Sequence, residues 1–193
     1  MKSMLKCSAL FNPTGASAAL PYILEYTYPW EVLPHIKEII LKIAESLDDS
    51  YERRGEDVWI SKFAKVAPTA YIAGPTIIME GAEIRHCAFI RGGALVGRGA
   101  VVGNSCELKN CILFDRAQVP HFNYVGDSIF GEGAHTGAGA VTSNLKSDKT
   151  LVTIRTEGGR VETGLKKFGA ILGDGVEVGC NTVLCPGTVV GKG

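Results

Sequence analysis

The chain has 193 residues, equal numbers of acidic and basic side chains, and 46% hydrophobic residues. This composition is typical of a globular protein with one domain, or with one domain and a small appendage. A net charge of zero gives no electrostatic case for nucleic acid or an anionic membrane as the main partner. No apolar run can cross a bilayer, and the opening residues lack the apolar stretch of a secretory signal.

The six cysteines form no CxxC pair. A disulfide framework or a zinc site would need other spacings and, for disulfides, an oxidising compartment. We therefore interpret the cysteines as reduced thiols of a cytoplasmic protein and expect no metal site.

The first element in chain order is the stretch PWEVLPHIKEIILKIAESLDD, residues 29–49. Its apolar residues recur at helical spacing and its exit is acidic, which predicts an amphipathic helix whose start is limited by Pro34. We assign residues 1–65 to an N-terminal helical segment.

From residue 66 the chain repeats every six residues. A period of six fits neither a helix nor long strands, but it suits a solenoid of short strands and turns. Three hexads per coil predict an all-β solenoid, the left-handed parallel β-helix, rather than a β-sandwich with coincidental alternation. Its interior would hold the residues that lead the hexads: Val66, Ile72, Ile78, Ile84, Ile90, Val96, Val102 and Leu108, with Phe114 leading the next hexad.

The same period returns at Leu172, so we assign residues 66–193 to the β-helix. Between the two stretches, residues 150–169 hold two β-prone arms around a Glu-Gly-Gly turn, which predicts a projecting β-hairpin. The segment GEGAHTGAG (131–139) looks like a phosphate-binding loop. Its glycines keep the six-residue phase and no P-loop lysine follows, so coil geometry explains them better.

The later leads are shifted by four residues from the earlier ones, and we place the break in the segment QVPHFNYVGDS, residues 118–128. The imidazole of His121 titrates near neutrality and suits a base that removes a proton from an amine or hydroxyl. Tyr124 adds a hydroxyl, and the amide of Asn144 can donate and accept. Lys146 and Lys149 follow closely.

Arg91 and Lys109 lie 18 residues apart, which is one full coil of three hexads. Both follow a hexad lead, so we expect them to stack about 4.8 Å apart. Two stacked cations with no acid between them indicate an anion site, for example for a sugar phosphate.

Three segments in order, PHFNYVGDS, GAGAVTSNL and KKFGAILGDGVEVGCNTVLCPGTVVGKG, make the chain resemble the hexapeptide-repeat acyltransferases. It is most similar to the C-terminal half of the bifunctional sugar-1-phosphate nucleotidylyltransferase/acetyltransferases, which include makers of UDP-N-acetylglucosamine. The resemblance covers roughly residues 30–193 and implies a homotrimer whose sites lie between neighbouring prisms.

The resemblance assigns His121 as the base that activates the amino group of a hexosamine phosphate. It assigns Arg91 and Lys109 to the substrate phosphate. The sugar would be held by Tyr124, Asn144 and, at a spacing one residue short, Lys149, with His135 standing where the family has an asparagine. Ala138 and Cys180 fall at positions that line acetyl-CoA, the cosubstrate.

The resemblance thus predicts an acetyl-CoA-dependent N-acetyltransferase, with no metal required, acting on an amino-sugar phosphate such as glucosamine-1-phosphate. The family's nucleotidyltransferase half has no counterpart in residues 1–65. An alternative is therefore a binding or regulatory subunit that works with a separate nucleotidyltransferase. A γ-type carbonic anhydrase shares the fold, but the four histidines lack the spacing of its zinc ligands.

Overall fold

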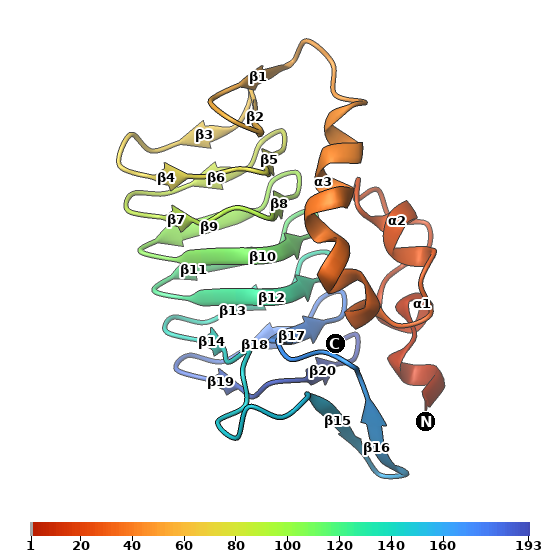
Figure 1. Cartoon of the computed structure of the whole chain (residues 1–193). Coiled ribbons are helices and arrows are strands. Elements are labelled where there is room, and N and C mark those ends of the chain that lie inside the picture. The colour runs from red at the N-terminus through yellow and green to blue at the C-terminus, as the bar shows by residue number, and fades with distance from the viewer. Residues whose placement is uncertain (1) are drawn as a thin grey trace.

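The six-residue period folds into short parallel strands, three to a coil, in a prism with helices along one side (Figure 1). The computed structural model describes residues 2–193. Each coil contributes one strand, or part of one, to each of three faces, which we call the helix face, the aromatic face and the polar face. This is the predicted left-handed parallel β-helix.

The helix face begins the prism and lies beneath the N-terminal helices. Its strands are β2 (Val58–Ser61), β5 (Thr76–Ile78), β8 (Ala94–Val96), the second halves of β10 (Glu107–Leu113) and β12 (Tyr124–Phe130), β17 (Ala170–Leu172) and β20 (Thr188–Val190). A further strand, β1 (Tyr51–Arg53), pairs antiparallel with β2. The parallel coils therefore begin eight residues before Val66.

The aromatic face consists of the strands that pair in order from β4 to β19. Its strands are β4 (Tyr71–Ile72), β7 (Phe89–Ile90), the first halves of β10 and β12, β14 (Val141–Thr142) and β19 (Val183–Leu184). The polar face consists of β3 (Lys65–Val66), β6 (Glu83–Ile84), β9 (Val101–Asn104), β11 (Gln118–His121), β13 (His135–Thr136) and β18 (Glu177–Val178).

The hexad leads fill the interior of the prism, as the period predicts. Those from Ile78 to Leu108 are buried in one continuous core. Val66 and Ile72 were expected to be buried as well but are only half-buried against that core, because they lie in the first coils at the open end of the prism.

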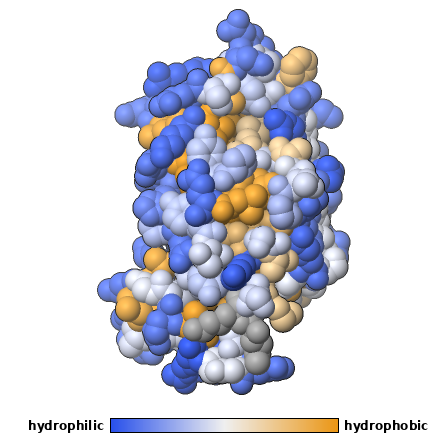
Figure 2. All heavy atoms as spheres, turned by 90° about the vertical axis from the view of Figure 1, so that its right-hand side faces the viewer, coloured by the Kyte–Doolittle hydropathy of each residue, from blue (hydrophilic) through white to orange (hydrophobic). Residues whose placement is uncertain are grey.

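The helix face is apolar on both sides, and its outer side forms a second core with the N-terminal segment. Its outward residues, such as Ile77, Leu95 and Ile112, pack with Ile36 and Ile40 of α3. The helical elements are η1 (Lys2–Leu5), α1 (Cys7–Leu10), α2 (Leu20–Leu24), η2 (Pro29–His35) and α3 (Ile36–Ala44). Seen from this side, many outward side chains of the segment are hydrophilic, with apolar ones scattered among them (Figure 2).

The single helix expected over residues 29–49 is instead a 3₁₀ segment, η2, followed by α3, which ends at Ala44. Pro34 lies inside η2. Proline has no backbone N–H to donate and its ring crowds the preceding turn, so α-helical hydrogen bonding begins after it.

The shift in repeat phase does not lie at His121 itself, although one of its two parts overlaps residues 118–128, where the break was expected. It comes from two shortened corners between the aromatic face and the helix face. Leu108 is in register with Ile90, yet Leu113, five residues later, is in register with Val96, six residues after Ile90. Val125 and Phe130 repeat this shortening one coil later. Two single-residue deletions leave the six-residue repeat in the same phase as one shift by four residues. Only the strand register distinguishes these two explanations.

Because of the shortened corners, Phe114 and His121 do not occupy the positions that the six-residue period predicted. Leu113 is the interior residue of its hexad, while Phe114 lies outside and packs on Phe11, with ring centroids 4.9 Å apart. His121 keeps the regular phase, two residues after Val119 and in register with Asn104.

The predicted hairpin is present as β15 (Thr153–Thr156) and β16 (Gly159–Glu162), which pair antiparallel and project from the last coils (Figure 1). Its base is anchored by Val152 and Ile154, both buried in the second core. The loop between β14 and β17 therefore leaves the prism and returns to it without interrupting the stacking of Ile129 on Ile171.

Candidate active site

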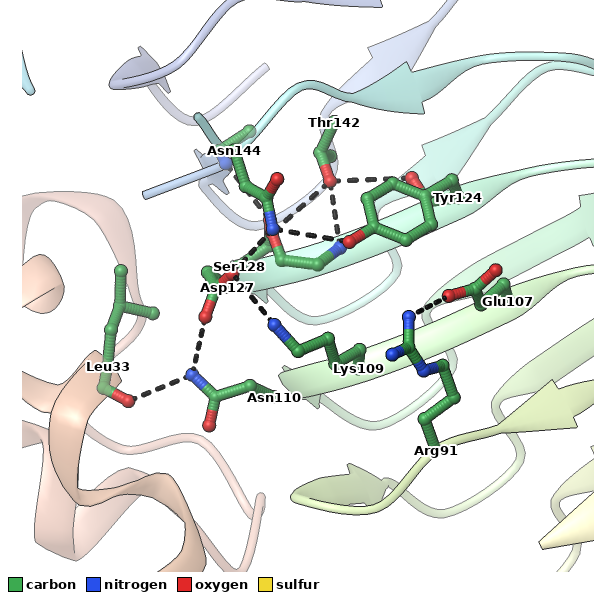
Figure 3. Close-up of polar contacts among 12 residues, drawn as sticks. Leu33, Arg91, Glu107, Lys109, Asn110, Tyr124, Asp127, Ser128, Thr142 and Asn144 are labelled. Carbon is green, nitrogen blue, oxygen red and sulfur yellow. Dashed lines mark hydrogen bonds and ion pairs between the residues drawn. The ribbon is translucent and has the colours of Figure 1, made fainter. Parts of the chain in front are cut away.

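A buried carboxylate, Asp127, organises the polar side chains at the corner between the aromatic and helix faces (Figure 3). Its Oδ1 accepts a hydrogen bond from Asn110 Nδ2 at 2.9 Å, and its Oδ2 accepts one from Asn144 Nδ2 at 2.5 Å. The Nζ of Lys109 lies 3.8 Å from Oδ2. We call Lys109, Asn110, Tyr124, Asp127 and Asn144 the Asp127 cluster.

The two shortened corners create this cluster. Asn110 and Asp127 occupy the same position in successive coils, and both have a φ of 49°. Asn and Asp tolerate this left-handed conformation better than most residues with a side chain. Asn110 Nδ2 also donates to the backbone oxygen of Leu33 at 3.1 Å. The N-terminal segment is thereby tied to the cluster.

Tyr124 enters the cluster through Asn144, whose Nδ2 donates to the tyrosine hydroxyl at 3.2 Å. Burial, and then the carboxylates of Asp127 and Glu107, raise the pKa of the Tyr124 hydroxyl above its ordinary value. The hydroxyl therefore stays protonated at neutral pH. Because its oxygen already accepts from Asn144, its hydrogen is available to a ligand.

Arg91 and Lys109 lie on adjacent rungs of this corner, since Ile90 is in register with Leu108. Each cation also has an acidic partner beside it, which the spacing of the two cations did not show. Arg91 Nη1 pairs with Glu107 Oε1 at 2.8 Å, and Lys109 faces Asp127 (Figure 3). Two acids therefore pair with the two cations. The spacing of Arg91 and Lys109 does not reveal these acids, because Glu107 lies on the coil of Lys109 and Asp127 lies on the next coil.

A cavity of about 290 Å³ opens beside the Asp127 cluster. It is lined by Leu33, Pro34, Asn110, Asp127, Leu165, Lys166 and Lys167. Sequence reasoning did not single out the two lysines, whose position follows from the return of the hairpin loop to the prism. They bring positive charge to the edge at which a phosphorylated ligand was expected.

His121 lies at the other edge of the aromatic face, at the exposed end of β11. Its backbone N–H donates to Oδ1 of Asn123 at 2.9 Å. Asn123 is buried, and its Nδ2 donates to the backbone oxygens of Gly137 and Ala140 at 2.8 and 3.0 Å. Asn123 thus anchors the corner from inside the prism while the imidazole of His121 faces outward.

Ala138 and Cys180 follow His121 down the same corner on successive coils. The N–H of Gly139 donates to the oxygen of His121 at 3.0 Å, and the N–H of Asn181 donates to that of Ala138 at 2.8 Å. Cys180 is exposed and Ala138 partly so. The histidine and the two residues that the resemblance assigns to acetyl-CoA therefore form one column.

His135 and Lys149 lie outside both groupings. His135 is on the polar face, where its Nδ1 is 2.6 Å from Oε2 of Glu177. Lys149 is exposed in the loop before the hairpin, and within residues 2–193 its side chain makes no hydrogen bond or ion pair. Within the single chain, neither residue lies with the Asp127 cluster or with the column headed by His121.

Within the described residues, no three His, Cys, Asp or Glu side chains gather as metal ligands. No helix of the described part has the length and hydropathy needed to cross a membrane.

The fold defines a class of protein. A crystal structure of a hexapeptide transferase family protein from Anaplasma phagocytophilum superimposes with a TM-score of 0.54 over 70% of this chain and 72% of that one, at 17% identity. The architecture is therefore that of the hexapeptide-repeat left-handed β-helices.

The sequence then gives the family. The model of the GMPPB C-terminal domain matches residues 72–193, and the chain belongs to that family. A Methanococcus vannielii relative, "Bifunctional protein GlmU", is 36% identical over 85% of this chain. A Sulfurisphaera tokodaii relative, a bifunctional sugar-1-phosphate nucleotidylyltransferase/acetyltransferase, is 29% identical over 88% of it. The chain spans 40% and 43% of these two relatives.

A shorter relative is more nearly matched in length. The putative uncharacterized acetyltransferase YaiX of Escherichia coli is 28% identical, with 81% of this chain and 67% of that one covered.

Proposed function

We propose that this chain is an acetyl-CoA-dependent N-acetyltransferase that acts on an amino-sugar phosphate such as glucosamine-1-phosphate. The observation that carries the proposal is that two groups of residues lie at the two edges of the aromatic face. An outward histidine heads the column of Ala138 and Cys180 at one edge, and the Asp127 cluster lies at the other. Relatives named as acetyltransferases support the reaction type.

His121 would act as the general base. The amino nitrogen of the sugar attacks the thioester carbonyl, the new C–N bond forms, and the C–S bond then breaks. The imidazole takes the proton from the amine and passes it to the leaving thiolate. The anchoring of the His121 backbone by Asn123 supports this role, because a base must be held within reach of its proton.

The Asp127 cluster would hold the acceptor. Arg91 is exposed in its pair with Glu107, and such exposed pairs contribute little to stability because solvent screens them. A phosphate can therefore displace Glu107 and bind Arg91 and Lys109 together. Asp127 keeps Asn144 in position, and the free hydrogen of the Tyr124 hydroxyl can donate to a sugar oxygen.

A homotrimer would bring the two edges of neighbouring chains together. The aromatic face presents a ladder of outward side chains in register: Tyr71, Phe89, Glu107, Tyr124, Val141 and Val183. Tyr71 and Val183 are each 60% exposed, and Phe89 is 42% exposed. Exposed apolar side chains gathered in this way mark association surfaces. The polar face, by contrast, carries the ladder of Lys65, Glu83, Val101, Gln118, His135 and Glu177.

The proposal is tested by coenzyme A thiol release from acetyl-CoA with a panel of hexosamine phosphates and their unphosphorylated counterparts. We expect release with an amino-sugar phosphate and much less with the unphosphorylated sugar. Should no acceptor give release, while an N-acetylated or nucleotide-linked sugar still binds by calorimetry, the binding-subunit alternative would replace the enzyme.

A further inference from the structure

A second cavity, of about 560 Å³, lies between the hairpin and the last coil of the prism. Its charged lining comes from Lys146, Arg155 and Arg160, and its floor from Cys185, Gly187 and Thr188. It is separate from the cavity beside Asp127, which is lined by other residues.

The two arginines face each other across the hairpin. In the antiparallel pair β15–β16, Arg155 is directly opposite Arg160. Like charges in this arrangement lower the stability of a sheet. Within residues 2–193 neither arginine forms an ion pair, although Glu162 lies on the same side of the hairpin, opposite Thr153. The repulsion between the arginines is therefore not relieved by the chain itself.

The hairpin is held firmly over this cavity. Val152 and Ile154 are buried at its base, and the backbone oxygen of Val152 accepts one hydrogen bond, from the hydroxyl of Thr163 at 2.5 Å. Gly187 has a φ of 83°, and a Cβ there would lie 2.7 Å from Val152 Cγ1. A glycine at this corner thus permits the close approach of the hairpin to the last coil.

The charge of the third cation, Lys146, is already partly compensated within the chain. Its Nζ donates to Thr150 Oγ1 at 2.6 Å and lies 3.4 Å from Asp148 Oδ2. The excess positive charge of the cavity therefore comes from Arg155 and Arg160. Guanidinium groups bind phosphoryl oxygens through paired hydrogen bonds, which lysine cannot do.

The cavity continues the corner that carries the Asp127 cluster. Thr142 is in register with Leu184, so Cys185 lies one rung below Ser143, next to Asn144. Successive rungs are about 4.8 Å apart. A phosphorylated ligand can therefore contact this cavity while another part of it, or a second substrate, lies at the cluster.

We propose that Arg155 and Arg160 form a second anion site, which binds a phosphoryl or pyrophosphoryl group between the hairpin and the last coil. The site does not depend on the proposed acyl transfer. Its ligand chemistry fits the phosphates of a coenzyme and those of a nucleotide-linked sugar equally.

The test is calorimetric titration of the full chain with inorganic pyrophosphate at low, fixed ionic strength. Three proteins are compared: wild type, the double variant Arg155→Gln/Arg160→Gln, and the control Arg53→Gln/Arg54→Gln. The control removes the same charge from exposed arginines that are paired with Asp57 and Glu52. We expect the first double variant to bind at least about tenfold more weakly and the control to bind as wild type does.

Thermal unfolding without and with pyrophosphate supplies a second readout. We expect Arg155→Gln/Arg160→Gln to be at least as stable as wild type, because it removes the opposed charges, and to lose the stabilisation by pyrophosphate. Equal binding by wild type and this variant, or an equal loss in the control, would overturn the site. Adenosine 3′,5′-bisphosphate and UDP, titrated in parallel, distinguish the two sources of the phosphate, and tighter binding of either supports the site. His121→Ala should retain pyrophosphate binding, so failure of the catalytic proposal is separable.

Discussion

Asn110 and Asp127 occupy equivalent corners of successive coils, and the amide of the first donates to the carboxylate of the second at 2.9 Å. Each corner is one residue shorter than those of the earlier coils. The shortening turns a structural repeat into a place where a buried carboxylate can hold a lysine and two amides. The deviations from the repeat, rather than the repeat itself, thus carry the polar chemistry of this edge.

The first prediction concerns Asp127→Asn. The substituted amide would present an NH₂ group to Asn144 Nδ2, two donors facing each other, or else to Asn110. We expect a loss of about 1–3 kcal/mol in the free energy of unfolding, together with a raised KM for the phosphorylated acceptor because Asn144 and Lys109 lose their anchor. Chemical denaturation and steady-state kinetics measure the two effects.

Asp115→Asn is the matched control. Asp115 is also buried and accepts a hydrogen bond from a backbone N–H, that of Arg98, at 2.9 Å, but it lies at another corner. It should lower stability without changing the KM. If both variants changed the KM equally, the assigned role of Asp127 would be wrong.

The second prediction concerns assembly. We expect wild type to sediment as a trimer and Phe89→Glu to shift toward monomers, because the substitution places a charge in the outward ladder of the aromatic face. Phe63→Glu is the control, since Phe63 is 66% exposed but lies in a turn outside this ladder. Sedimentation velocity at micromolar concentration measures the oligomeric state of wild type and of both variants. A monomeric wild type, or dissociation by both variants, would contradict the trimer.

The third prediction concerns alkaline pH. Burial raises the pKa of the Cys111 thiol from 9.0 to about 12. Between these values the unfolded thiol loses its proton while the folded one keeps it, so Cys111 alone lowers the free energy of unfolding by about 1.4 kcal/mol per pH unit above about pH 9. Cys111→Ala should make this slope shallower by the share of Cys111, while the share of the Cys7 thiol, whose pKa burial also raises to about 12, remains. Cys180→Ala, at an exposed thiol, should leave the slope unchanged. Denaturation curves from pH 8 to 10.5 give the slopes, and an identical slope in Cys111→Ala would refute the assignment.

The fold could be predicted because its cause is local: a bulky apolar lead every six residues requires three short strands per coil. The position of the phase shift could not. Two one-residue deletions near Leu108 and Val125 leave the same later phase as one irregularity at His121, and the difference is visible only in the register. The break expected within residues 118–128 therefore corresponds to only one of the two shortened corners, that between Val125 and Phe130, and His121 itself keeps the regular phase.

The candidate site was predicted in its residue types but not in its contacts. Arg91 and Lys109 were placed on one column by their spacing of one coil, yet their acidic partners were missed. Asn110 and Asp127 are 17 residues apart, a spacing that has meaning only once the corner is known to be shortened. Contacts across coils depend on the length of each coil, and a single inserted or deleted residue changes them all.

The most direct measurement is the rate of acetyl transfer to glucosamine-1-phosphate by wild type, His121→Ala and His86→Ala in one assay. His86 lies at the same corner two coils earlier, where its Nδ1 is 2.9 Å from Thr69 Oγ1. If His121 is the base, His121→Ala should fall by about 10²–10⁴-fold in turnover with its unfolding transition unchanged, and His86→Ala should keep the wild-type rate. Wild-type turnover that persists in His121→Ala would contradict the account.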